Sequence, residues 1–316
     1  MPAGHNKTDK YFNNIKIDKE NDVCFFNDEQ HKYYNKETMQ TYISCTTIIG
    51  KYGQEFQSEF WASYKALEAL LPADVFKPIK VSLLSTKKFD SKILDTIDID
   101  KNQFELKKQE ILNGYKRASE DACKKGTLAH EKKELSFYNR TDFDFGKYGY
   151  KDLKGKFDCK ENYYKLDLKN GVYPEFLIQW ESPNKDLMIA GISDLVIVNE
   201  NDLYIIDWKT SKTIEKKSYF NKFTGKSEKM KFPLNNLDCC NYIKYSLQLS
   251  LYAWMIQQQR PDLNVKGLMI IQLKDDGTEV QYPCEYLKSD VERMINHYIK
   301  HQKIQKELDR DKPIEI

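Results

Sequence analysis

The stretch 191–209 constrains the fold of this chain more than any other. It contains two short apolar runs rich in β-branched residues, 195–198 and 203–206, and the polar tetrad 199–202 separates them. Two such runs joined by a short polar turn are typical of an antiparallel β-hairpin. The sequence therefore predicts two adjacent strands with a tight turn between them.

Three charged residues sit at one edge of this predicted hairpin. Asp194 lies at the start of the first strand and Asp207 at the end of the second, so the turn brings both carboxylates together. Lys209 follows Asp207 by two residues, and the strand period of two puts both side chains on one face. Two close carboxylates repel each other unless a cation lies between them, and oxygen ligands suit Mg²⁺ or Mn²⁺. The set suits metal-assisted hydrolysis of a phosphodiester, with the lysine orienting a water or stabilising charge on the phosphate. Asp-x-Lys alone is common and often marks only a solvated strand end.

Composition limits the partners of the chain. It has 316 residues and a net charge of only +2, with 31% charged residues, so any surface for a polyanion must be local. The seven cysteines form no Cys-x-x-Cys pair, which favours reduced thiols in an intracellular protein. No apolar run is long enough to span a bilayer, so we expect a cytoplasmic protein without membrane contact.

The first half of the chain is predicted to be mainly helical after an N-terminal strand region. We expect residues 1–20 to be frayed, strands at 23–26 and 32–36, and a short helix capped by Ser44 and ended by Gly50. Apolar residues at helical spacing predict a helix over 55–71, ended by Pro72, whereas 75–102 has little periodicity and is read as an insertion. A helix over 103–123 is expected to break at 124–127, with Thr127 capping a second helix over 128–138.

The second half predicts a sheet and two further helices. A loop over 139–171 leads into a strand at 173–181 and then the central hairpin. A helix at 242–259 presents Leu247, Leu251, Trp254 and Met255 on its apolar side, and strands at 265–273 and 278–284 precede a final helix at 288–309. We divide the chain into N-terminal strands and helices, 1–102, and a core, 103–316, within one compact unit.

Five motifs occur in order along these elements. They are Gly126-Thr-Leu-Ala-His130, Pro174-Glu175, Gly191-Ile-Ser-Asp194, Asp207-Trp-Lys209 and Gln248-Leu-Ser-Leu-Tyr252. Together they resemble the PD-(D/E)XK nuclease superfamily, and within it the RecB- and Cas4-like branch that includes phage exonucleases. Glu29-Gln-His-Lys-Tyr33 and Ser44-Cys-Thr-Thr47 add a weaker likeness to phage-type members, which implies that the protein acts in the cytoplasm of a bacterial or phage-infected cell. The resemblance implies an α/β fold of the restriction-endonuclease type, with a central mixed sheet flanked by helices and helical N-terminal additions.

The resemblance also assigns roles to matching positions. It implies Mg²⁺ or Mn²⁺ ligands at His130, Asp194, Asp207 and the main-chain carbonyl of Trp208. Lys209 is the expected catalytic lysine, and Glu175 would assist with a second metal ion or its water. Taken alone, His130 reads more simply as a surface histidine.

DNA contacts are expected from two further regions. By resemblance, Gln248 and Tyr252 contact DNA or orient Lys209, although their i, i+4 spacing also suits simple packing on the sheet. The segment 212–232 interleaves lysines with aromatic residues, so Lys212, Lys222 and Lys226 are expected to neutralise phosphates while rings stack on bases. The alternative is a solvated hairpin.

The function implied by the resemblance is a metal-dependent DNA exonuclease acting in replication, recombination or repair. Only Cys284 follows Cys240, so no iron-sulfur cluster is expected. The chain has no Walker A motif, which makes any accompanying helicase or recombination protein a separate partner. The alternatives are a structure-selective or restriction-like endonuclease, an RNA endonuclease, and a DNA-binding subunit without turnover.

Overall fold

A mixed β-sheet with helices on its faces forms the centre of the computed structural model, which describes residues 10–138, 142–150, 153–156, 159 and 168–310. Within these residues the sheet has nine strands. In spatial order they are β15 (Glu279–Cys284), β14 (Asn264–Leu273), β11 (Asp202–Lys209), β10 (Met188–Asn199), β6 (Thr41–Ser44), β5 (Lys32–Asn35), β4 (Cys24–Asn27) and β3 (Lys19–Glu20), with β9 (Gly171–Glu181) also beside β10. The β11–β14 and β10–β6 pairs are parallel, whereas the other pairs are antiparallel. The predicted α/β class with a mixed central sheet is confirmed.

The sheet forks along one edge of β10. Strand β9 pairs with one edge of β10 over most of its length, so β6 and β11 share the other edge. The β6 pairing ends at Ala190, and the β11 pairing begins at Leu195. Residues 191–194 lie between these two pairings, and the predicted central hairpin is confirmed on the β11 side. Asp194 therefore sits in the middle of β10 and not at its start, because β10 begins at Met188, six residues before Asp194.

The N-terminal region contains more structure than predicted. The strands expected at 23–26 and 32–36 are β4 and β5, but residues 10–20 also form β1 (Lys10–Phe12), β2 (Ile15–Ile17) and β3. The expectation of fraying was wrong for residues 10–20, while residues 1–9 lie outside the described part. Tertiary contacts supply the order: Lys10 and Lys36 both pair with Glu20, and the Asn27 amide donates to the Lys16 carbonyl over 2.8 Å.

Helix α1 (Cys45–Tyr52) follows directly from β6. As predicted, Ser44 is its N-cap, and its hydroxyl accepts the Thr47 N–H over 3.1 Å. The helix does not end at Gly50 as expected; it ends at Tyr52, with Gly53 as the capping residue. Gly50 keeps helical backbone because Ile48, Ile49 and Tyr52 are buried against the sheet side of the molecule.

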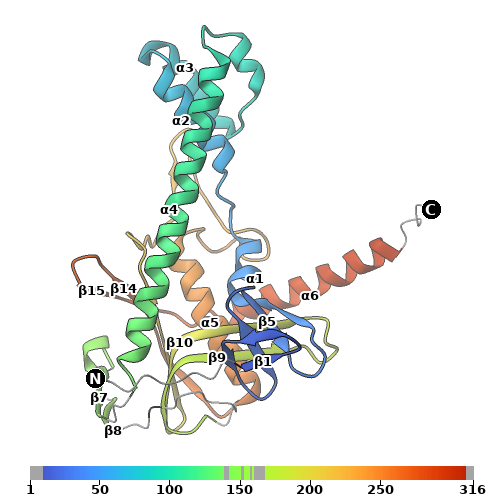
Figure 1. Ribbon diagram of the computed structural model, residues 1–316, viewed down its shortest axis with the longest axis vertical. Helices are drawn as coiled ribbons and strands as arrows, with labels where there is room; N and C mark the ends of the chain where they lie inside the picture. The colour runs from blue at the N-terminus through green and yellow to red at the C-terminus, as the bar shows by residue number, and fades with distance from the viewer. Residues whose placement is uncertain (1–9, 139–141, 151–152, 157–158, 160–167, 311–316) are drawn as a thin grey trace.

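A helical unit stands apart from the sheet at the opposite end of the molecule (Figure 1). It consists of α2 (Ser58–Leu70), α3 (Ala73–Thr86), the 3₁₀ helix η1 (Ser91–Asp95) and the first turns of α4 (Lys101–Leu135). We call it the tower. Its separate core includes Phe60, Leu67, Phe76, Leu83 and Phe104. The segment 75–102, for which weak periodicity predicted an insertion and no particular element, is largely helical, and Pro78 inside α3 helps to explain the weak periodicity.

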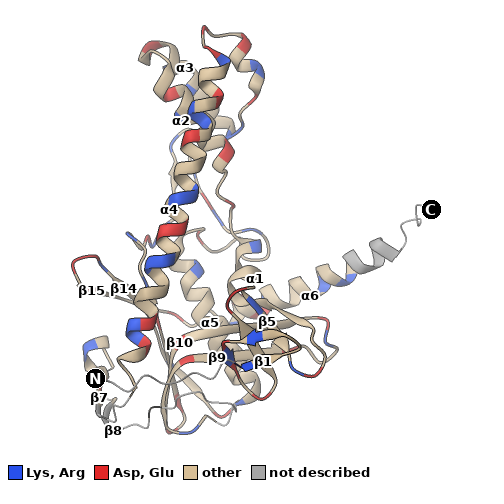
Figure 2. Cartoon of the chain, in the orientation of Figure 1, with Lys and Arg blue, Asp and Glu red and all other residues tan. Residues whose placement is uncertain are grey.

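Helix α4 joins the tower to the sheet as one continuous helix. The break expected at 124–127 does not occur, and Thr127 is no cap, because its hydroxyl donates to the Cys123 carbonyl within the helix over 3.2 Å. Ion pairs from Lys125 to Asp275 and from Lys133 to Glu279 hold the C-terminal part of α4 against the β14–β15 hairpin. Gly126 lies inside the helix although glycine there costs about 1 kcal/mol relative to alanine. Charges of both signs line the exposed middle of the helix (Figure 2).

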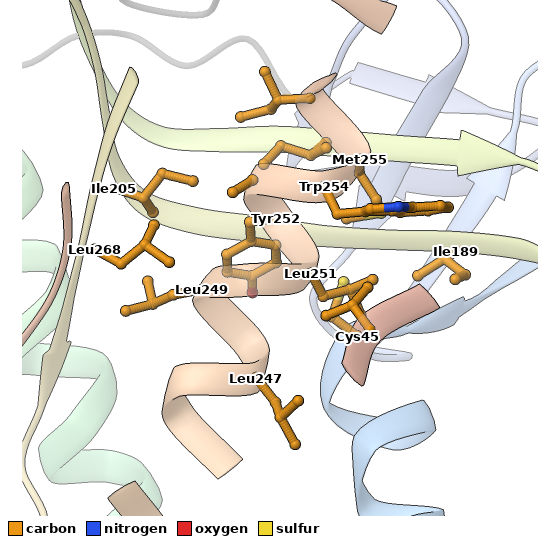
Figure 3. Packing of buried hydrophobic residues seen from close by; sticks show 14 of the residues in the cluster. Cys45, Ile189, Ile205, Leu247, Leu249, Leu251, Tyr252, Trp254, Met255 and Leu268 are labelled. Carbon is orange, nitrogen blue, oxygen red and sulfur yellow. The ribbon is translucent and has the colours of Figure 1, made fainter. Parts of the chain in front are cut away.

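Both faces of the sheet are covered. On one face lies α5 (Asn241–Gln259), predicted from its apolar side, whose Leu247, Leu251 and Met255 are fully buried (Figure 3). Helices α1 and α6 (Lys288–Arg310) pack against α5. On the other face a second cluster gathers around Trp208 and Phe137. It includes residues from β7 (Asp142–Asp144), η2 (Phe145–Tyr148) and the segment before β8 (Lys154–Lys156), so the stretch expected to be a loop is structured where it is described.

Candidate active site

The fork in the sheet lets a carboxylate replace a backbone hydrogen-bond partner. Beyond the Leu195–Ile206 pair, β11 follows β14 as far as the pairing of Lys209 with Gln272. The Trp208 N–H donates over 2.7 Å to Oδ2 of Asp194. Asp194 is only 7% exposed, so this bond fixes the direction of a buried carboxylate. The topology therefore places an acid from β10 beside the end of β11.

His130 approaches the same carboxylate from α4. Its Nδ1 lies 3.2 Å from Oδ1 of Asp194, so the two oxygens of Asp194 have different partners. Burial lowers the pKa of His130, but the bond and charge of Asp194 and the charge of Asp207 outweigh it and raise the pKa to about 9. Burial alone would raise the pKa of Asp194, yet His130 and Lys209 bring it below its ordinary value. Without a metal ion this is a charged pair.

Asp207 and Lys209 form the second ionic pair of the site. As the strand period predicted, both side chains share a face, and Nζ of Lys209 lies 2.6 Å from Oδ2 of Asp207. Burial raises the pKa of Asp207 to about 6, although Lys209 opposes this effect. Burial lowers the pKa of Lys209, but the charges of Asp207 and Asp194 outweigh it and raise the pKa. The lysine is therefore an ammonium at neutral pH. Its Nζ also lies 5.0 Å from the centre of the Tyr245 ring.

Glu175 occupies an unusual backbone position opposite Asp194. In the β9–β10 ladder Ser193 pairs with Phe176 and Leu195 with Pro174, so Glu175 and Asp194 face each other. Glu175 has a φ of +48°, a left-handed conformation that costs a side-chain-bearing residue energy and is concentrated at functional sites. Its carboxylate accepts a hydrogen bond from Lys19 over 2.7 Å. Burial raises the pKa of Glu175 in spite of Lys19.

Three of these residues form a group that fits a divalent cation. One ligand atom each from His130, Glu175 and Asp194 lies within 4.8 Å of the others, the one such group found in the part of the chain that the structure describes. Two carboxylates and an imidazole are ligands that Mn²⁺ and, through oxygen, Mg²⁺ accept. Asp207 is not in this group, and its buried Oδ2 has no aligned hydrogen-bond donor among the described residues, although Lys209 is near. The expected ligand role of Asp207 and of the Trp208 carbonyl stays a prediction.

Gln248 and Tyr252 lie together on α5, as their spacing predicted. The Gln248 amide donates to the Tyr252 hydroxyl over 2.9 Å. Tyr252 is 2% exposed, and it lies against Gly191 in the core shown in Figure 3. This burial supports the packing alternative for Tyr252. DNA contact by Gln248, which is partly exposed, stays a prediction.

The predicted lysine-aromatic segment forms a small hairpin beside the tower. Strands β12 (Phe220–Asn221) and β13 (Lys226–Ser227) pair within it. Lys212, Lys222 and Lys226 are exposed, as are the rings of Tyr219 at 55%, Phe220 at 53% and Phe223 at 46%. The Asn221 amide donates to the Leu84 carbonyl, and Lys87 pairs with Glu228, which fastens the hairpin to α3 and its end. The hairpin is solvated, and DNA contact there stays a prediction.

Two charged residues near the site were not predicted. Lys19 lies 3.6 Å from Glu134 as well as contacting Glu175. Glu134 follows His130 by one helical turn, a spacing that could have identified it. Nothing in the sequence around Lys19 indicates that it lies beside Glu175. Lys19 is on β3, the last strand in the spatial order that begins with β15.

Comparison with known proteins gives one family. The model described as the PD-(D/E)XK nuclease superfamily matches residues 100–313. No curated protein matches the chain. One solved structure, titled "Crystal structure of SSO0001", has 16% sequence identity and a TM-score of 0.24 over 42% of this chain and 50% of that chain. The chain spans half the length of that structure.

Proposed function

Because the chain belongs to the PD-(D/E)XK nuclease superfamily, whose model covers residues 100–313, we propose that it is a DNA exonuclease of the RecB- and Cas4-like branch. Membership implies a metal-dependent nuclease. The observation that carries the finer proposal is the group of His130, Glu175 and Asp194 beside the Asp207–Lys209 pair. The five ordered motifs that contain these residues resemble those of the branch, and this resemblance supports the choice of branch.

A divalent cation held by His130, Glu175 and Asp194 would lower the pKa of a bound water and neutralise charge on a phosphate. The chain itself prepares the rest of the site. The Trp208 N–H and His130 hold the two oxygens of Asp194 in fixed directions. Lys209, kept as an ammonium by Asp207 and Asp194, offers a positive charge to the phosphate as negative charge develops during attack. In this protonation state it does not accept a proton, so electrostatic stabilisation is its proposed role.

The proposed substrate is DNA with an end, single-stranded or duplex. Lys212, Lys222 and Lys226 would neutralise phosphates, and the exposed rings of Phe220 and Phe223 offer faces on which unpaired bases can stack. Contacts with the tower already hold the hairpin that carries these rings in place. Less conformational entropy is therefore lost when the rings bind DNA. Gln248 is proposed to contact DNA, with Tyr252 holding it in position.

The biological setting belongs to the same proposal. We place the reaction in DNA replication, recombination or repair, in the cytoplasm of a bacterial or phage-infected cell, with a separate helicase or recombination protein supplying the DNA end. Among the described residues no helix has the length and apolar character needed to cross a membrane.

The decisive experiment is cleavage of end-labelled linear DNA beside a covalently closed circle. Single-stranded and duplex forms are incubated with Mg²⁺, Mn²⁺ or EDTA. The wild type is compared with Lys209→Ala and with Lys77→Ala, an exposed lysine of the tower that serves as the matched control. The proposal expects metal-dependent loss of linear DNA only, which is strongly reduced in Lys209→Ala and retained in Lys77→Ala.

Other outcomes identify the alternatives. Nicking of the circle would replace the exonuclease with an endonuclease, and preferential cleavage of an RNA competitor would indicate an RNA endonuclease. Binding of DNA with no cleavage in either metal would leave a subunit without turnover.

A further inference from the structure

A lysine from outside the matched part of the chain enters the site. Nζ of Lys19 lies 2.7 Å from Oε2 of Glu175 and 3.6 Å from Oε1 of Glu134. All three side chains are largely shielded, with 28%, 16% and 21% of their side-chain surface exposed. Lys19 precedes residue 100, where the family match begins. The ammonium thus bridges a proposed metal ligand and a second acid that is not in the ligand group.

The position of Lys19 is built into the fold. Its neighbour Asn21 is buried, and the Asn21 amide donates to the Gln179 side chain over 2.5 Å and to the Leu177 carbonyl over 3.3 Å. These bonds fasten the end of β3 to β9, the strand that carries Glu175. The acceptor on the other side is also held, because the Tyr138 hydroxyl donates to Glu134. The contact between Lys19 and the acids therefore follows from packing and not from the reach of a solvated side chain.

A divalent cation and the Lys19 ammonium compete for the same carboxylate. The cation would need Glu175 together with His130 and Asp194, while Lys19 already holds one Glu175 oxygen. Two positive centres on one partly buried carboxylate repel each other strongly. Glu134, 3.6 Å from the ammonium, is an acceptor to which Lys19 can turn without entering solvent.

We propose that Lys19 is the built-in counter-ion of Glu175 and that binding of a divalent cation transfers it to Glu134. The inference rests on the proposed function, since it concerns the metal ligands of that site. The N-terminal strands then have a function in the nuclease, because Lys19 on β3 neutralises the charge of Glu175 before the metal ion binds. Lys19 is in this sense a positioning residue, and Glu134 is its second partner.

Binding of Mn²⁺ to the protein without DNA tests the transfer. The free ion is followed by electron paramagnetic resonance, and the heat of binding by calorimetry. Lys19→Met removes the competitor and is expected to bind Mn²⁺ about tenfold more tightly or better. Glu134→Gln removes the second acceptor and is expected to bind severalfold more weakly. Lys36→Met, which breaks the 2.6 Å pair with Glu20 in the same N-terminal sheet, is the matched control and should leave the affinity unchanged.

A double-variant cycle separates transfer from general electrostatics. Removing any nearby negative charge weakens cation binding, so Glu131→Gln, an exposed acid on the same part of α4, measures that general effect. If Lys19 moves to Glu134, then Glu134→Gln weakens Mn²⁺ binding more in the wild type than in Lys19→Met. Circular dichroism without metal verifies that each variant is folded. Should Lys19→Met fail to fold, the comparison of Glu134→Gln with Glu131→Gln decides.

The outcomes distinguish the two levels of proposal. If the wild type binds Mn²⁺ and Lys19→Met binds it with the same or a lower affinity, Lys19 is not the counter-ion of Glu175, and the nuclease proposal still stands. Equal effects of Glu134→Gln in both backgrounds, or equal effects of Glu134→Gln and Glu131→Gln, overturn the transfer. Wild type that binds no Mn²⁺ refutes the metal site and the inference with it.

Discussion

Gly191→Ala should destabilise the protein although Gly191 lies in a strand, where alanine is normally preferred. A Cβ at this position would lie 2.6 Å from Cε1 of Tyr252 and 2.9 Å from Sγ of Cys45. Both neighbours are buried, so neither can swing into solvent. Overpacking of this kind costs about 1–3 kcal/mol, whereas loss of the glycine's freedom in the unfolded chain returns about 0.5–1 kcal/mol. We expect a net loss of about 1–2 kcal/mol.

Urea denaturation measures this change. The midpoint should fall while the slope against urea stays the same, because the surface exposed on unfolding does not change. Gly50→Ala is the matched control, since nothing lies within 4 Å of a Cβ there and the residue is in a helix; its unfolding free energy should rise by up to about 1 kcal/mol. A Gly191→Ala protein as stable as the wild type would refute the argument that close packing on Tyr252 requires this glycine.

Three further predictions concern the site. Lys209→Ala should lower the cleavage rate by about 10²–10³-fold with little loss of Mn²⁺ affinity, measured by single-turnover cleavage and calorimetry; near-normal cleavage would contradict the electrostatic role. His130 has a folded-state pKa of about 9, raised above 6.5, so its pairing with Asp194 contributes stability that is complete below about pH 6.5 and is lost as the pH rises through 9. The melting temperature of the metal-free protein should therefore decrease as the pH rises from about 6.5 to 9. Mn²⁺ affinity should increase over the same pH range as His130 loses its proton. Both trends should be absent in His130→Gln. Replacing Phe220 and Phe223 by alanine should weaken binding of single-stranded DNA by about 1–3 kcal/mol per lost stack, measured by fluorescence titration. The cleavage rate at saturating DNA should not change. Equal DNA affinity of the variant and the wild type would show that the two rings do not bind DNA.

Local patterns predicted the elements that carry the site. The hairpin follows from its two β-branched runs and polar turn, and the period of two correctly places Asp207 and Lys209 on one face. The cap at Ser44 and the apolar side of α5 were likewise readable, because both depend on neighbours within one or two helical turns. Each of these features is set by residues close together in the chain.

Errors arose where distant contacts decide the local structure. Helix α4 passes through Gly126 and Thr127 because Lys125 and Lys133 pair with the β14–β15 hairpin, whose residues lie about 150 positions away in the chain. Residues 10–20 form strands because Glu20 and Asn27 hold Lys10 and the Lys16 carbonyl. Neither effect leaves a periodic signal in the sequence.

The sequence by itself determined the order of the motifs, the hairpin and the identity of the acids, the histidine and the lysine that gather at the proposed metal site. Only the tertiary structure decided which of those side chains pair with one another. The fork at β10 frees the Trp208 N–H for Asp194, and the left-handed turn of the backbone at Glu175 presents that acid to the ligand group. Packing of β3 against β9 then brings Lys19 to the same carboxylate. Residue types fix which charges are available, whereas the distances that decide which charges pair are set by strands far apart in the chain.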